Sequence, residues 1–339
     1  MARSADRGPG LDGVLVLAKP SGPTSHDVVA LVRRLAATKR VGHGGTLDPF
    51  AAGVLPVFLG RATRLVEYHM ADGKAYRAAV CFGARSTTDD LEGELAPVDA
   101  TPPDRAAVEA ALVPFRGRIL QRPPAFSALK VSGRRAYELA RAGTPPELAP
   151  REVTIGRLEL VAWDGADPAR PVATLEIECG AGTYIRALAR DLGEALGCGA
   201  YLGSLVRTAS GPFRLADALS LDALRDAAAD GAAGVARLLG PIDAGLDQLP
   251  RLVLPPAEVR AAVRGQRVRP ERRPVGLADG STVRLVDEAG TLVGVATWQA
   301  GRLAPDKILV PLPPADDVAA GPSEVDRDAS SAGDVADGG

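Results

Sequence analysis

The chain has 339 residues, of which 46% are hydrophobic and 24% are charged, and its formal net charge at pH 7 is −2. This composition is typical of a soluble globular protein long enough for two domains, each with its own core. The sequence contains no run of the ~18 apolar residues that a membrane-spanning helix needs, and its first ten residues do not resemble a secretory leader. We therefore expect a cytoplasmic protein that does not bind a membrane.

The first half of the chain contains strand and helix patterns. The apolar run GVLVLAK predicts a buried strand over residues 13–19. Apolar residues at helical spacing predict an amphipathic helix over residues 26–37, with Ser25 as its N-cap and a glycine-rich loop after it. Alternating apolar and polar residues predict half-buried strands over residues 75–82 and 172–179.

The second half begins with a helix pattern over residues 183–196, followed by Gly197 as a C-cap. Its apolar face consists of Ile185, Leu188, Ala189 and Leu192. Strands and helices are mixed without regular alternation, which favours an α+β fold over a doubly wound one. Residues 240–252 are rich in turn residues and predict a domain boundary. The short strand patterns TVRLVD, TLVGVATW and KILVP after it predict a small β-rich domain.

The cysteines and the charge distribution narrow the class of protein. Cys81, Cys179 and Cys198 are odd in number and widely spaced, so they fit buried thiols better than a disulfide frame or a zinc site. Residues 116–151 carry a local net charge of +6 and residues 251–273 carry +5. Two such segments could bind a polyanion, although solvated surface arginines would give the same pattern. The last residues, 313–339, carry −6, have almost nothing to bury and are expected to be disordered.

The stretch VGHGGTLDPFAAGVLP, residues 41–56, carries the strongest candidate for chemistry. Glycines allow positive φ and close approach of a ligand to the backbone, while Pro49 restricts Asp48 to extended conformations. An Asp with an ordinary pKa of about 3.9 is ionised at neutral pH and can act as a nucleophile or a base. A simple turn would have the same composition, so this stretch alone leaves both interpretations open.

Five blocks in order extend this motif into a family resemblance. GHGGTLDPFAAGVLPVFLGRATRL resembles the signature G-H-x-G-x-L-D-P-x-A-x-G-x-L-P of the TruB family of tRNA pseudouridine synthases, bacterial type. The other blocks are DGVLVLAKPSGPTSHDVV, KAYRAAVCFGARSTTDDLEG, QRPPAFSALKVSGRRAYELARAG and CGAGTYIRALARDLGEALG. The resemblance spans roughly residues 12–215, and the family's turn motif is slightly altered at Ser86, Thr87, Thr88 and Asp89.

The resemblance implies a fold and a reaction. It implies a flexible N-terminus (1–10), a catalytic domain (11–245) with a mixed, mainly antiparallel sheet flanked by helices, and a PUA-like RNA-binding domain (250–312). Residues 116–151 would form a basic insertion that clamps the T-arm of tRNA. The implied reaction isomerises uridine 55 in the T-loop to pseudouridine in a monomeric enzyme, without cofactor or metal. An additional role in tRNA folding is compatible with this activity.

The resemblance also implies roles for individual residues. Asp48 is the expected nucleophile, Arg186 its ionic partner, and Tyr76 the aromatic ring on which the flipped base stacks. The expected substrate-binding residues are His43, Tyr184, Leu205, Lys19 and Lys130. The basic side chains expected to contact phosphate are Arg116, Arg118, Arg122, Lys130, Arg134, Arg135 and Arg141.

Four of these roles have an alternative. Tyr76 could pack in the core as a strand aromatic, and Tyr184 could pack at a helix start. Lys19 could neutralise phosphate or pack against the Asp48 motif, and His43 could be a structural hydrogen-bonding residue like His26 and His69. For the whole chain, the rivals are a non-catalytic tRNA-binding protein and a small-substrate hydrolase using Asp48 and His43.

Overall fold

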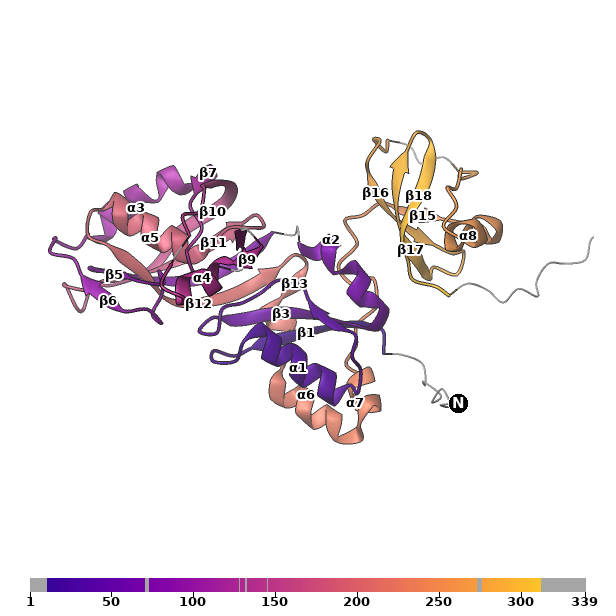
Figure 1. The fold of residues 1–339 in the computed structure, drawn as a ribbon, viewed down its shortest axis with the longest axis horizontal. Coiled ribbons are helices and arrows are strands. Elements are labelled where there is room, and N and C mark those ends of the chain that lie inside the picture. The colour runs from indigo at the N-terminus through magenta and orange to yellow at the C-terminus, as the bar shows by residue number, and fades with distance from the viewer. Residues whose placement is uncertain are drawn as a thin grey trace, which may run out of the picture. The chain divides into compact units, whose positions relative to one another are not determined.

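The computed structural model describes residues 11–70, 73–127, 129–131, 133–144, 146–272 and 276–311. By internal contacts the chain divides into two compact units, with the division between Pro250 and Arg251 (Figure 1). The expected flexible N-terminus (1–10) and disordered tail (313–339) lie outside the described residues. Within the described residues, no helix is both long and apolar enough to span a bilayer.

The first unit is built on a ten-stranded sheet in the order β14-β1-β3-β12-β4-β11-β10-β7, with β2 paired to β3 and β13 paired to β12. Among the described strand pairs of this sheet, β1–β14 and β3–β12 are parallel and the others are antiparallel. The expected α+β fold with a mixed, mainly antiparallel sheet is confirmed. The strands are β1 (Gly13–Lys19), β2 (Val41–His43), β3 (Ala52–Leu59), β4 (Lys74–Phe82), β7 (Gly117–Gln121), β10 (Arg151–Asp164), β11 (Val172–Cys179), β12 (Ala200–Ser210), β13 (Phe213–Arg214) and β14 (Leu219–Ser220).

Helices and short hairpins flank this sheet (Figure 1). The α-helices are α1 (Ser25–Leu35), α2 (Val66–Met70), α3 (Arg105–Ala111), α4 (Ala136–Arg141), α5 (Ile185–Ala195), α6 (Leu221–Ala227) and α7 (Ala232–Ala236). The short strands β5 (Ala84–Ser86), β6 (Leu95–Pro97), β8 (Lys130–Val131) and β9 (Arg134–Arg135) form two hairpins. The 3-10 helices are η1 (Gly60–Leu65), η2 (Val113–Phe115), η3 (Leu215–Asp217) and η4 (Ala228–Asp230).

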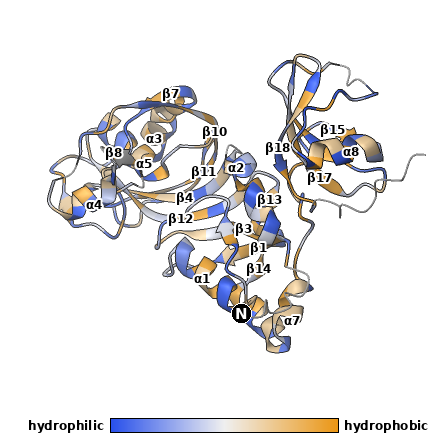
Figure 2. Ribbon diagram, turned by 45° about the vertical axis from the view of Figure 1, so that its right-hand side comes forward, coloured by the Kyte–Doolittle hydropathy of each residue, from blue (hydrophilic) through white to orange (hydrophobic). Residues whose placement is uncertain are grey.

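Two apolar clusters hold the helices to the sheet. Helix α5 buries its predicted face, including Leu188 and Leu192, against residues of β4, β11 and β12 such as Leu175. Helix α1 packs with β1, β3 and α6 in a second cluster that includes Val32 and Leu55. Figure 2 shows hydrophobic and hydrophilic residues on different parts of α1, as expected for an amphipathic helix. Burial of these apolar faces fixes the elements that carry the candidate site.

Helix boundaries differ from the predictions by one or two residues. Thr24, not Ser25, is the N-cap of α1: its hydroxyl accepts from the N–H of Asp27, whose carboxylate accepts in return from the N–H of Thr24. This capping box satisfies the free N–H groups of the first turn, so Ser25 is the first helical residue. Leu196 is the C-cap of α5, and Gly197 follows it with φ +73°.

The second unit is a four-stranded sheet with one helix, in the order β15-β16-β17-β18. Its elements are β15 (Arg251–Val253), α8 (Pro256–Val263), β16 (Thr282–Val286), β17 (Leu292–Gln299) and β18 (Arg302–Ile308). The third predicted strand, KILVP, was misplaced: β18 begins at Arg302, because buried Leu303 pairs opposite Trp298. The expected small β-rich domain is confirmed.

Candidate active site

Asp48 lies in the loop between β2 and β3, residues 44–51, called here the Asp48 loop. The guanidinium of Arg186, in the first turn of α5, pairs side-on with its carboxylate. The Nε–Oδ2 distance is 2.9 Å and the Nη2–Oδ1 distance is 3.3 Å. The Arg186 side chain is 8% exposed, whereas that of Asp48 is 35% exposed. The carboxylate is thus oriented by a buried cation and remains open on one side.

Arg186 is itself held from three directions. Its Nη1 lies 3.4 Å from Oδ2 of Asp90 and donates to the carbonyl of Thr88 at 3.2 Å. Its Nη2 also donates to the carbonyl of Phe126 at 2.9 Å. A guanidinium with these donors occupied cannot rotate without breaking several hydrogen bonds, so the orientation of Asp48 is fixed by the surrounding backbone.

Several opposing effects determine the pKa of Asp48, and burial is the largest of them. Burial raises the pKa of the Asp48 carboxyl above its ordinary value, Arg186 opposes that rise, and Asp90 adds to it. At 35% exposure, the Asp48 carboxylate is also less solvated than that of a fully exposed Asp. This environment suits a nucleophile or base, in which the negative charge is kept ready by one specific partner.

Asp90 is a site residue that sequence reasoning missed. Its side chain is 3% exposed, and its Oδ1 accepts from the Thr88 hydroxyl and from the N–H of Glu92. Ser86 donates its hydroxyl to the backbone carbonyl of Asp90, closing the turn. The altered turn over residues 86–89 ends one residue before Asp90. The signal available was a hydroxyl-rich turn ending in two consecutive aspartates.

Two buried polar side chains tie the Asp48 loop to α1 and β1. Lys19 is 1% exposed, and its Nζ donates to the carbonyls of Pro49 at 3.2 Å and Ala51 at 2.6 Å. The Ser25 hydroxyl accepts from the N–H of Leu47 at 2.8 Å and donates to its carbonyl. Of the two alternatives for Lys19, the structure places it against the loop. Burial lowers the pKa of Lys19 to about 8.

Tyr76 and Leu205 lie on neighbouring strands, β4 and β12, in the same apolar cluster as the Asp48 loop residues Leu47 and Phe50. Tyr76 is 9% exposed and Leu205 is 7% exposed. Burial raises the pKa of the Tyr76 phenol to about 12, so it is neutral at physiological pH. Sequence-distant residues therefore converge on one apolar wall beside the Asp48 loop.

Tyr184 is the N-cap residue of α5, two residues before Arg186. Its backbone N–H donates to Oε1 of Gln121 at 2.9 Å, and its carbonyl accepts from Nε2 of the same side chain at 3.1 Å. Gln121 is 1% exposed and was not predicted as a site residue. It fixes the start of α5 and thereby the position of Arg186.

His43 lies in β2 at the start of the loop region, half-buried, with its ring 5.6 Å from that of His26 in an edge-on arrangement. Its Nδ1 accepts from the N–H of Gly45 at 3.3 Å, so this tautomer carries its proton on Nε2. Burial lowers the pKa of the His43 imidazole. His26 is exposed and His69 is buried, consistent with surface and structural positions.

The predicted basic insertion, residues 116–151, is called here the basic segment. It begins with strand β7 of the main sheet, which pairs with β10 from Gln121 opposite Arg151 to Gly117 opposite Ile155. The exposed arginines among the described residues of this segment are Arg116, Arg118, Arg122, Arg134, Arg141 and Arg151. Lys130 belongs to β8, but its side chain and that of Arg135 lie outside the described part of the structure. The base of the segment touches the site: the Phe126 carbonyl accepts from Arg186, and the Arg122 carbonyl accepts from Arg190 at 2.7 Å.

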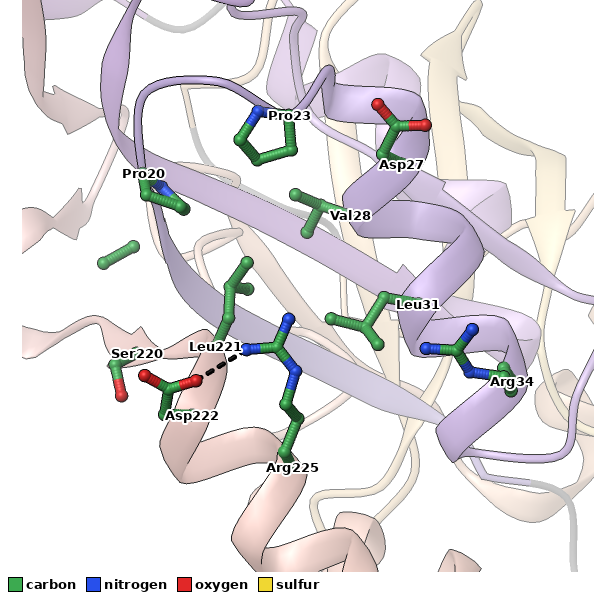
Figure 3. Close-up of a pocket in the computed structure, with 11 residues that line it drawn as sticks. Pro20, Pro23, Asp27, Val28, Leu31, Arg34, Ser220, Leu221, Asp222 and Arg225 are labelled. Atoms are coloured by element: carbon green, nitrogen blue, oxygen red, sulfur yellow. Dashed lines mark hydrogen bonds and ion pairs between the residues drawn. The ribbon is translucent and has the colours of Figure 1, made fainter.

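A separate cleft of about 480 Å3 lies between α1 and α6 (Figure 3). Leu31 and Arg34 line it from α1, and Leu221 and Arg225 line it from α6, where Arg225 pairs with Asp222 at 2.6 Å. None of the predicted site residues lines this cleft. Among the described residues, no group of three or more His, Cys, Asp or Glu side chains could hold a metal ion.

Comparison with protein-family models places the chain in the pseudouridylate synthase class. Residues 33–185 match the family model "TruB family pseudouridylate synthase (N terminal domain)". Residues 186–247 match "tRNA pseudouridylate synthase B C-terminal domain", and residues 250–309 match "Pseudouridine synthase II TruB, C-terminal". The chain belongs to the TruB family, which confirms the resemblance seen in the five sequence blocks.

Two relatives of similar length are both named tRNA pseudouridine synthase B. A protein of Burkholderia lata named tRNA pseudouridine synthase B is 44% identical, over 88% of this chain and 91% of its own. A protein of Symbiobacterium thermophilum with that name is 52% identical, over 72% of this chain and 79% of its own. Among solved structures, a chain in "Crystal Structure of a Cbf5-Nop10-Gar1 Complex" is 26% identical, with a TM-score of 0.69 and 92% of both chains covered.

Proposed function

We propose that this enzyme isomerises uridine 55 in the T-loop of tRNA to pseudouridine. The observation that carries the proposal is the half-open Asp48 carboxylate, fixed side-on by buried Arg186 beside the apolar wall of Tyr76 and Leu205. The tRNA substrate is supported by the relatives named tRNA pseudouridine synthase B, at 44% identity over most of both chains. The uridine position follows from the sequence resemblance.

The chemistry requires a flipped base and one charged group. The bond between N1 and the ribose breaks, the uracil turns over, and a bond forms between C5 and the same ribose carbon. C5 loses its proton and N1 gains one, so the atoms balance without an oxidant, a reductant or a cofactor. Asp48 acts as the nucleophile in this exchange, and Arg186 keeps its carboxylate ionised and aimed at the substrate.

The surrounding residues have distinct proposed tasks. Tyr76 stacks on the flipped base, which returns about 1 to 3 kcal/mol of the cost of unstacking, and Leu205 packs against the same base. His43 contacts the RNA and occupies the gap that the base leaves. Tyr184 lines the pocket, Lys19 holds the Asp48 loop, and Lys130 binds the substrate from the basic segment.

The basic segment, residues 116–151, clamps the T-arm through phosphate contacts made by its exposed arginines. The second unit, which matches the family's C-terminal model, adds further arginines for RNA binding. We propose that the enzyme works as a cytoplasmic monomer and that tRNA folding is an additional role.

The decisive experiment compares wild type with Asp48→Asn on unmodified tRNA transcript. Pseudouridine is mapped chemically at nucleotide resolution, and tRNA affinity is measured in parallel. We expect wild type to modify position 55 and Asp48→Asn to bind tRNA normally without product, because the substitution keeps the size and removes the charge. Product from Asp48→Asn near the wild-type rate, or modification elsewhere, would contradict the proposal. A tRNA-folding assay with both proteins tests the additional role.

A further inference from the structure

Arg207, in β12, is a buried cation that sequence reasoning did not single out. Its side chain is 1% exposed, and it is among the largest fully buried side chains of the described structure. Within the described residues it forms no ion pair with a carboxylate. Burial lowers the pKa of its guanidinium, which is the direction expected for a charge taken out of water without an anionic partner. A buried charge of this kind is costly, and an apolar residue at this position would avoid the cost.

The guanidinium of Arg207 donates hydrogen bonds to backbone carbonyls before and after Asp48 in the chain. Nε donates to Val54 at 2.9 Å, Nη2 donates to Gly45 at 3.1 Å, and Nη1 donates to Thr46 at 3.3 Å. Gly45 and Thr46 precede Asp48 within the loop, and Val54 follows it in β3. One planar fork therefore holds the chain on both sides of the carboxylate through three separate nitrogens in a fixed geometry.

The positive charge of the same guanidinium also acts on the Tyr76 phenol, lowering its pKa against the larger, opposite effect of burial. Tyr76 lies directly across from Arg207 in the β12–β4 register. Lys19 holds the remaining part of the loop through the carbonyls of Pro49 and Ala51. The backbone on either side of Asp48 is thus fixed by two buried cations, and Arg207 occupies the β12 position that is paired with Tyr76 of β4.

We infer that Arg207 is a positioning residue for the isomerisation: it fixes the Asp48 loop relative to Tyr76, so that the carboxylate and the stacked base meet in the reactive geometry. The inference deepens the proposed function and rests on it. Arg207 does not touch the substrate in this role. A displacement of about 1 Å at a reacting group can reduce a rate about 100-fold, so loss of the fork is expected to slow chemistry rather than binding.

The test is a single-turnover reaction of Arg207→Lys with tRNA transcript, which reports a rate constant and an amplitude separately. The lysine keeps a positive charge, but its single nitrogen replaces the three separate nitrogens that donate to Val54, Gly45 and Thr46. We expect the rate constant to fall about 100-fold, with tRNA affinity within about threefold of wild type. Arg77→Lys is the matched control: Arg77 lies on β4 in an exposed pair with Glu176 and is expected to leave the rate constant unchanged.

The amplitude of the single-turnover reaction shows whether Arg207 positions the reacting groups or only stabilises the fold. A purely structural role would reduce the active fraction and leave the rate constant of the remaining molecules unchanged, which would overturn the inference. Arg207→Gln serves for the same comparison if the lysine variant does not fold; failure of both to fold would also overturn it. A wild-type protein without pseudouridine activity would instead refute the proposed function itself.

A double-mutant cycle tests the link to Tyr76. Tyr76→Phe removes the phenol oxygen and keeps the ring. If Arg207 acts partly through that oxygen, the double variant with Arg207→Lys will react faster than the product of the two single effects predicts. Independent, multiplicative effects would overturn the part of the inference that concerns Tyr76.

Discussion

Asp48 and Asp90 bind the same guanidinium from different sides. Asp48 meets Nε of Arg186 at 2.9 Å and is 35% exposed, while Asp90 meets Nη1 at 3.4 Å and is 3% exposed. The two carboxylates thus share one cation but differ in access to water. The buried carboxylate anchors the arginine, and the half-exposed one is left for substrate.

Replacing Arg186 by lysine tests the side-on pair. Arg186→Lys keeps the charge but loses the two-point contact with Asp48 and the hydrogen bonds to Thr88 and Phe126. We expect the single-turnover rate to fall at least about 100-fold, with tRNA affinity nearly unchanged. Arg157→Lys, in an exposed cluster with Glu159, is the control. A rate within about threefold of wild type would show that the two-point contact is unnecessary.

The substitution Asp90→Asn separates the hydrogen bonding of Asp90 from the effect of its negative charge on Arg186 and Asp48. The amide keeps the size and can still accept from Thr88, but it no longer pairs ionically with Arg186. We expect a slower reaction, and also a lower pKa for Asp48, since Asp90 is one of the groups that raise it. The pH at which the rate is half-maximal on the acidic side should therefore move down. An unchanged midpoint would mean that Asp90 exerts no measurable field at Asp48.

The pH dependence of wild type follows from the raised pKa of Asp48. The reaction requires the ionised carboxylate, so single-turnover rates should decline as pH falls through this pKa, at a higher pH than for an ordinary Asp. The sign for stability is opposite: the folded state binds this proton more tightly than the unfolded state. This group alone therefore makes stability decrease as pH rises through that window. Titration of the Asp48 carboxyl by NMR in the free enzyme would check both statements.

The salt dependence of tRNA affinity tests whether the basic segment contacts phosphates. If exposed arginines of residues 116–151 contact phosphates, the logarithm of tRNA affinity should fall linearly with the logarithm of salt concentration. Arg118→Ala, which removes a side chain that is 77% exposed, should reduce the magnitude of that slope by about 1. Arg105→Ala, on α3 and paired with Glu109, is the control and should leave the slope unchanged. Equal slopes for all three proteins would exclude Arg118 as a phosphate contact.

A glycine in the loop motif has a purely steric explanation. Gly53 has φ +124°, and a Cβ there would lie 2.3 Å from the carbonyl oxygen of Arg207 and 2.4 Å from its nitrogen. Gly53→Ala should therefore destabilise the protein by about 3 kcal/mol or more, measured by denaturant unfolding. Gly42→Ala is the control, because a Cβ there meets its nearest neighbour, Val66, at 3.8 Å. Similar unfolding midpoints for both variants would refute this account.

The sequence predicted elements with a clear period and motifs with a fixed spacing. Strand β11 and the apolar face of α5 were predicted correctly, because one face of each packs on the core. Asp90 was missed because its partner, Arg186, is far away in sequence and meets it only through the folded turn. Arg207 was missed because an arginine in an alternating strand normally points to solvent, whereas here it is 1% exposed.

The burial of Arg186 has a consequence for an enzyme whose proposed substrate is a polyanion. Every nucleotide brings a phosphate that could compete with Asp48 for an accessible guanidinium, and such an exchange would release the carboxylate from its position. With an 8% exposed side chain, donors taken by Thr88 and Phe126, and Asp90 beside it, Arg186 cannot be reached by phosphate. In the proposed complex the carboxylate would keep its partner, and the exposed basic side chains of residues 116–151 would meet the backbone of the nucleic acid.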